Sequence, residues 1–156
     1  DDELVLYCDA MDVTINAYPH EITQEYIDNF EGKVVFNAEI NPTNWTNMPK
    51  LVYKPHTLGD LERKYINAGV FMGRAKPMLE VLRQWTATFR EAKEFFNAGA
   101  TGCDQAPLVI TWNNNPNLPI VVDSFEHIMA VYPVEDADWI ADSVMIRHDQ
   151  NLKKAK

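Results

Sequence analysis

The chain has 156 residues, of which 46% are hydrophobic and 24% charged, the composition of an ordinary globular domain and not of a disordered or fibrous protein. Its formal net charge of -9 argues against a nonspecific nucleic-acid binder, because such proteins need a basic surface that releases counterions from phosphates. An acidic chain fits metal-assisted binding of a small ligand better.

The cysteines and the hydropathy pattern exclude further classes. Cys8 and Cys103 form no C-x-x-C pair, so neither a structural zinc site nor a disulfide framework is predicted. No apolar stretch approaches the about 20 residues of a membrane helix, and the first residues lack the basic start of a signal peptide. We therefore expect a soluble folded domain, and the sequence does not indicate its compartment.

The first 39 residues predict a strand, a helix and a second strand. Residues 4–8 form a short continuous apolar run, which is typical of a strand buried on both faces. Thr23 can cap the helix that follows, Gly32 ends it, and residues 33–39 read as a second buried strand. The predicted apolar face of the helix comprises Ile22, Tyr26, Ile27 and Phe30.

The middle of the chain contains a long loop, a strand and a helix. Residues 41–60 are rich in Pro, Asn and Thr, and loops of this length are usually functional. The strand-like run that follows is interrupted by Gly69 and Gly73, which indicates a bulge or a close backbone approach. A helix is predicted from after Pro77 up to Asn97. Its stripe of expected core residues is Met78, Leu79, Leu82, Trp85, Phe89, Phe95 and Phe96.

The last third predicts one helix and three strands. Asp104 stands at the start of the helix, where capping is its commonest role. Short strands are expected within residues 116–123 and 127–132. Residues 143–149 predict a final strand that delivers His148 at its end, followed by a basic tail.

Two carboxylates, Asp9 and Asp12, follow the first predicted strand. Open α/β sheets bind ligands outside the carboxyl ends of their strands. From spacing alone, the pair could equally cap the turn into the next helix. The alternative is a hard divalent cation, because Mg²⁺ and Mn²⁺ prefer oxygen ligands and take one or two carboxylates together with substrate phosphates.

Other candidate site residues also lie near the ends of predicted elements. Together with the aspartates, His148 makes a donor set for Mn²⁺, although a lone histidine there is more often a hydrogen-bonded surface residue. Asn67 offers an amide inside a strand, and Lys153 could neutralise phosphate oxygens unless it is simply solvated.

The order of these motifs resembles a known enzyme family. LYCDAMDV, VVFNAEINPTNW, YINAGVFMGRA, GCDQAPLVI and VMIRHDQN occur in an order similar to that of the A-type-fold sugar-nucleotide glycosyltransferases. The resemblance is greatest to the glycosyltransferase domain of the procollagen lysyl hydroxylase family and its microbial and viral relatives. It implies a mixed α/β sheet flanked by helices, with a UDP-sugar and Mn²⁺ (or Mg²⁺) bound, and transfer of a hexose to a protein or glycan hydroxyl with retention.

The resemblance also assigns roles to residues of this chain. Asp9 and Asp12 would hold the metal in an Asp-x-x-Asp arrangement, with His148 as the third protein ligand. Asn67 and Asp104 would lie at the reacting sugar. The remaining substrate contacts that it implies are Trp45, Gly69, Gln105 and Lys153.

The family has a nucleotide-binding half before the strand of the aspartate pair. Since residue 1 precedes that strand directly, we expect residues 1–156 to form a single glycosyltransferase-like domain without its N-terminal half. The reduced acidic run at Cys103-Asp104, and His148-Asp149-Gln150-Asn151 in place of His-Gly-Asn-Gly, depart from the family pattern.

Two other functions stay open at this stage. The first is a noncatalytic structural or binding domain that keeps the glycosyltransferase fold. The second is a Mg²⁺-dependent phosphohydrolase that uses Asp9 as nucleophile, which the absence of a recognisable downstream Ser/Thr and Lys set disfavours.

Overall fold

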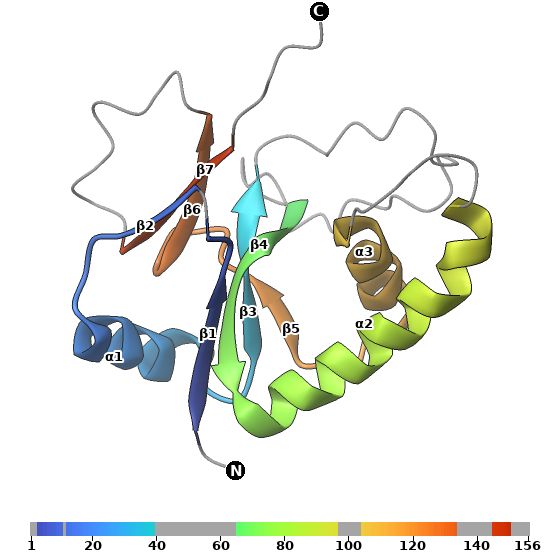
Figure 1. Cartoon of the computed structure of the whole chain (residues 1–156). Coiled ribbons are helices and arrows are strands. Elements are labelled where there is room, and N and C mark those ends of the chain that lie inside the picture. Colours follow the sequence, from blue (N-terminus) through green and yellow to red (C-terminus); the bar gives the residue numbers. More distant parts are fainter. Residues whose placement is uncertain (1–2, 11, 40–64, 97–103, 134–144, 151–156) are drawn as a thin grey trace, which may run out of the picture.

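A computed structural model of the chain describes residues 3–10, 12–39, 65–96, 104–133 and 145–150 (Figure 1). Within these ranges the chain forms two β-sheets and three helices. None of the described helices is both long and apolar enough to cross a membrane.

The larger sheet has four strands in the order β1-β4-β3-β5. Its strands are β1 (Leu4–Cys8), β4 (Tyr65–Arg74), β3 (Val34–Glu39) and β5 (Ile120–Val122). β4 runs antiparallel to β1 and β3, whereas β3 and β5 are parallel. The sheet is therefore mixed, and the α/β class predicted from the sequence is confirmed.

A smaller sheet has three strands in the order β2-β7-β6. Its strands are β2 (Val13–Ile15), β7 (Ile146–Gln150) and β6 (Met129–Pro133). β7 is antiparallel to β2 and parallel to β6. The central strand β7 thus joins the beginning of the chain to its last third.

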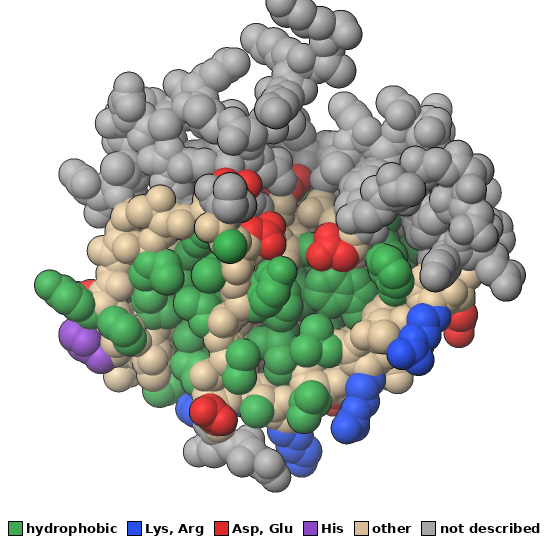
Figure 2. Space-filling view, viewed as in Figure 1, with side chains coloured by type: hydrophobic (Ala, Val, Ile, Leu, Met, Phe, Trp, Pro, Cys, Tyr) green, Lys and Arg blue, Asp and Glu red, His purple; other side chains and the backbone are tan. Residues whose placement is uncertain are grey.

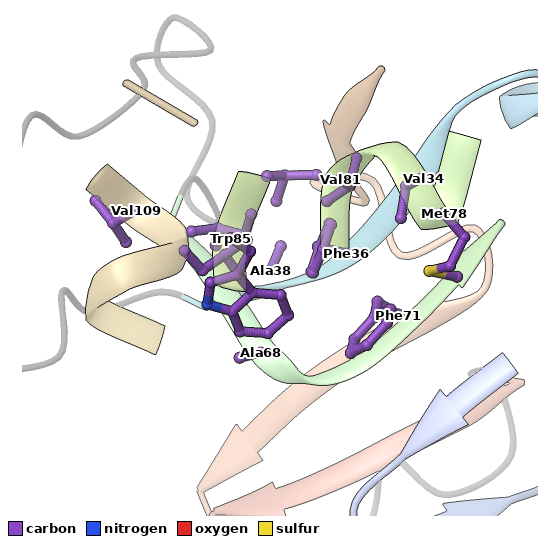
Figure 3. Packing of buried hydrophobic residues seen from close by; sticks show 12 residues of the cluster. Val34, Phe36, Ala38, Ala68, Phe71, Met78, Val81, Trp85 and Val109 are labelled. Carbon is purple, nitrogen blue, oxygen red and sulfur yellow. The ribbon is translucent and has the colours of Figure 1, made fainter. Parts of the chain in front are cut away.

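The helices lie on opposite faces of the larger sheet (Figure 1). They are α1 (Pro19–Phe30), α2 (Ala75–Phe96) and α3 (Gln105–Asn114). On one face, Phe36 and Phe71 pack against Trp85 of α2 in a buried cluster that extends to Val109 of α3 (Figure 3). On the other face, Val35 and Val70 belong to a second cluster with α1 and with Met129 and Ile146 of the smaller sheet.

The prediction that residues 4–8 are buried on both faces is wrong. Val5 and Tyr7 are 38% and 45% exposed, and Leu4, Leu6 and Cys8 are half-buried against the second cluster. The physical reason is that β1 is an edge strand, paired within the described residues with β4 alone. A continuous apolar run indicates a strand, but it does not encode the strand's place in the sheet.

The helix predictions need smaller corrections. α1 begins at Pro19, with Tyr18 as the N-cap residue; Thr23 lies inside the helix and donates its hydroxyl to the Pro19 carbonyl at 2.7 Å. α2 begins at Ala75, ahead of Pro77, because a proline in the first turn forfeits no intrahelical hydrogen bond. Three residues expected in the core are exposed: Ile27, Leu79 and Phe89.

A buried tyrosine fastens β3 to β4 at one end of the larger sheet. The hydroxyl of Tyr26 donates to the Lys33 carbonyl at 2.7 Å and accepts the Arg74 N–H at 3.3 Å. Beside it, a Cβ on Gly73 would lie 3.1 Å from the Lys33 carbonyl oxygen, so the predicted close approach of this glycine is confirmed. One phenol therefore satisfies two backbone groups there.

We expect Tyr26→Phe to lower the free energy of unfolding by about 1–2 kcal/mol, because it leaves the Lys33 carbonyl and the Arg74 N–H without their shared partner. Urea unfolding followed by circular dichroism measures the change. Tyr18→Phe, at a side chain that is 70% exposed, is the matched control and should change the free energy by less than about 0.5 kcal/mol. Equal effects of the two substitutions would contradict the anchoring role of Tyr26.

Candidate active site

A three-residue bulge in β4 organises the candidate site. Phe36 of β3 pairs with Phe71, but the next residue, Asn37, pairs with Asn67. Residues 68–70 of β4 therefore have no partner in β3. The predicted irregularity at Gly69 is confirmed, and bulges of this kind re-aim a strand where it borders a ligand site.

Two amide side chains satisfy the backbone of the bulge. The Gly69 N–H donates to Oδ1 of Asn67 at 2.8 Å, and the Ala68 N–H donates to Oε1 of Gln105 at 3.3 Å. Both amides are more than nine-tenths buried. Because an unpaired buried N–H is costly, Asn67 and Gln105 hold the bulge in shape.

β1 ends beside the bulge. Cys8 pairs with Val70, and the Asp9 N–H then donates to the Gly69 carbonyl at 2.8 Å. The backbone of Asp9 is thus fixed by the same residues that Asn67 and Gln105 support.

Together with burial, the carboxylates of Asp9 and Asp104 both raise the pKa of the Tyr7 hydroxyl. The Tyr7 hydroxyl donates to Oδ1 of Asp9 at 3.2 Å. Burial raises the pKa of Tyr7, and the negative charges of Asp9 and Asp104 raise it further. Asp104 occupies the N-cap position of α3, as predicted, but its side chain makes no capping hydrogen bond. These two predicted site residues therefore lie on the same face of the sheet.

An apolar groove lies beside these carboxylates. It has a volume of about 390 Å³, and among the described residues that line it Asp104 is the charged one. Figure 2 shows apolar side chains covering much of this face over β1 and α2, with acidic side chains next to them. The lining residues are Val5, Tyr7, Phe71, Met78, Leu82, Trp85 and Asp104.

Two buried polar residues at the end of β3 were missed by the sequence analysis. Nδ2 of Asn67 donates to Oε1 of Glu39, which is only 5% exposed. The Nδ2 atom of Asn37 is buried and has no hydrogen-bond partner among the described residues. The signal for both residues was the change from apolar to polar within VVFNAE, but Asn67, the partner of Glu39, lies 28 residues further on.

The register of the smaller sheet sets the backbone of His148 beside Val13, the residue that follows Asp12. Asp12 directly precedes β2, and the next residue, Val13, pairs with His148 of β7. His148 is in the middle of β7 and not at its end, which corrects the sequence prediction. The side chain of His148 lies outside the described part of the structure, as do Trp45 and Lys153 entirely.

The side chains that the structure describes contain no group of three or more His, Cys, Asp or Glu residues close enough to hold a metal ion. Asp9 and Asp12 are described, but the third predicted ligand is described by its backbone alone. The metal set stays a prediction.

The structure so far defines an α/β protein with acidic residues gathered at one end of a mixed sheet. A family model described as the PLOD GT domain matches residues 1–98, from before β1 through α2. Since this is more than half of the chain, the protein belongs to the PLOD glycosyltransferase-domain family. No curated protein matches the chain. The predicted resemblance is confirmed, and the family indicates a glycosyltransferase-type function.

We expect Gln105→Ala to lower the free energy of unfolding by about 1–3 kcal/mol, because it leaves the buried Ala68 N–H unpaired. Chemical denaturation measures this loss. Gln84→Ala, on the exposed side of α2, is the matched control. If Gln105→Ala is as stable as this control, the amide does not support the bulge.

Asp9→Asn should lower the pKa of Tyr7, because it removes a neighbouring negative charge; the pKa should stay above the ordinary value of 10.0 because burial, the largest cause, persists. Titration of the Tyr7 ring by NMR measures the change, and Asp28→Asn on the exposed side of α1 is the control. An unchanged pKa in Asp9→Asn would contradict the contact between Tyr7 and Asp9.

Proposed function

We propose that the protein is a metal-dependent retaining hexosyltransferase that moves a sugar from a UDP-sugar to an acceptor hydroxyl of a protein or glycan. Membership of the glycosyltransferase family supports the reaction class. The observation that carries the metal dependence is the backbone register that sets His148 beside Val13, next to Asp12.

The donor chemistry of these residues fits Mn²⁺. Asp9 and Asp12 supply carboxylates at the two ends of the short connection from β1 to β2, and imidazole favours borderline metals over Mg²⁺. Asp9, Asp12 and His148 would hold the ion. When bound, it would neutralise charge on the diphosphate of the leaving UDP.

Asp104 would act on the sugar. Its carboxylate is free of a capping hydrogen bond, borders the groove and shares with Asp9 an influence on Tyr7. There it could stabilise positive charge that develops at the anomeric carbon while an acceptor hydroxyl attacks from the same face.

Asn67 and Gln105 would serve the reaction through the bulge. Oδ1 and Nδ2 of Asn67 bond Gly69 and Glu39, and Oε1 of Gln105 bonds Ala68. In this arrangement both amides would position Asp9, in addition to the contacts with the sugar that the family resemblance implies for them. Gly69, Trp45 and Lys153 remain proposed substrate contacts on the strength of the family resemblance.

The proposal is tested by calorimetry of UDP binding with and without Mn²⁺. We expect binding only with Mn²⁺, and a loss of at least about tenfold in affinity in Asp12→Ala, because one of few charged ligands is removed. Asp28→Ala, an exposed carboxylate on α1, is the matched control and should bind as the unmodified protein does.

UDP binding that is independent of Mn²⁺, or equal in Asp12→Ala and Asp28→Ala, would contradict the metal-dependent proposal. Absence of any UDP binding would favour the noncatalytic alternative. A radiolabelled UDP-hexose hydrolysis assay then distinguishes a binding domain from a transferase.

A further inference from the structure

Asp123 is a buried carboxylate that the proposed reaction does not use. It follows β5 directly and is 1% exposed. Its Oδ1 accepts the His127 N–H at 2.9 Å, and its Oδ2 accepts the N–H groups of Ile128 and Met129 at 2.7 and 2.8 Å. Both oxygens of this one side chain therefore fix the backbone that enters β6.

The hydrogen bonds continue from this backbone to β7. The Ile128 carbonyl accepts the N–H of Ile146, the first residue of β7, at 2.8 Å. Ile128 and Ile146 are both fully buried, so water does not compete for this bond. The register continues with Met129 beside Ile146 and Val131 beside His148. His148 is thus two residues beyond a strand start that Asp123 positions.

Asp123 is also tied to the larger sheet. Its N–H donates to the Phe36 carbonyl at 2.9 Å. Phe36 is the last residue of β3 before the register changes at the bulge. The backbone of Asp123 therefore joins the sheet that carries Asp9, while its side chain joins the sheet that carries His148.

Burial and these hydrogen bonds have opposite effects on the pKa of Asp123. Burial raises the pKa of Asp123, and the hydrogen bonds from Met129, Ile128 and His127 act in the opposite direction. A carboxylate suits the position because its two oxygens can receive all three donors, whereas an amide would direct an N–H at one of them.

We propose that Asp123 is a positioning residue for His148, which it sets at a fixed place relative to Asp9 and Asp12 by linking the two sheets. The part of this inference that concerns metal affinity rests on the proposed function. The part that concerns the position of β7 does not.

The first test is Mn²⁺ affinity in Asp123→Asn, measured by electron paramagnetic resonance of free Mn²⁺ under conditions where the protein stays folded. We expect the dissociation constant to rise about tenfold, as it does when a residue that orients a metal ligand is changed. Amide hydrogen exchange of residues 146–148 in the metal-free protein is the second measurement, and it should accelerate in Asp123→Asn.

Thr111→Val is the matched control. Thr111 is fully buried, and its hydroxyl lies 2.7 Å from the Pro107 carbonyl and 2.8 Å from the Thr88 hydroxyl, among residues of α2 and α3. It should lose stability while its Mn²⁺ affinity and its exchange at residues 146–148 stay those of the unmodified protein.

Equal Mn²⁺ affinity and equal exchange in Asp123→Asn and the unmodified protein would overturn the inference. Equal losses of Mn²⁺ affinity in Asp123→Asn and Thr111→Val, with equal acceleration of exchange at residues 146–148, would also overturn the inference, because they would reveal general destabilisation. If the unmodified protein binds no Mn²⁺, the proposed function fails, and the exchange of residues 146–148 alone decides whether Asp123 positions β7.

Discussion

The arrangement of the site depends on three residues of β4 that have no partner in β3. The Asp9 N–H continues the β1–β4 register by donating to the Gly69 carbonyl, so Asp9 is attached directly to the backbone of the bulge. The backbone amides that the bulge displaces must find other acceptors, and Asn67 and Gln105 provide them. A requirement for hydrogen bonds thus explains why amide side chains are buried beside a carboxylate-rich surface.

β3 connects the two parts of the proposed metal set. The Phe36 carbonyl accepts the N–H of Asp123, and the Asp123 side chain binds the N–H of Ile128, whose carbonyl bonds the first residue of β7. The register of β3 with β4 changes immediately after Phe36. Phe36 is also fully buried against Trp85 and Phe71. Because a close-packed core resists displacement, Phe36 holds the backbone of β3 and the attached backbone of Asp123 in fixed positions relative to each other.

The sequence predicted features that depend on local pattern. The strand before Asp9, the irregularity at Gly69 and the helix after Asp104 all follow from runs of residue types. Features that depend on distant pairing were missed or misplaced. The exposure of Tyr7 depends on β1 being an edge strand, and the burial of Glu39 depends on Asn67 across the sheet. The pairing of β7 with β2 and β6 places His148 inside its strand, and no local sequence pattern encodes that register.

The two ends of the larger sheet are secured by different means. At one end, the phenol of Tyr26 bridges two neighbouring strands by itself. At the other end, the backbone N–H groups of the bulge are hydrogen-bonded only when Asn67 of β4 and Gln105 of α3 are both in place. Local opening has the lowest free energy where the fewest independent contacts must break together. A single change at Tyr26 therefore releases both backbone groups at its end of the sheet, whereas a change at either Asn67 or Gln105 leaves the other amide's hydrogen bond in place.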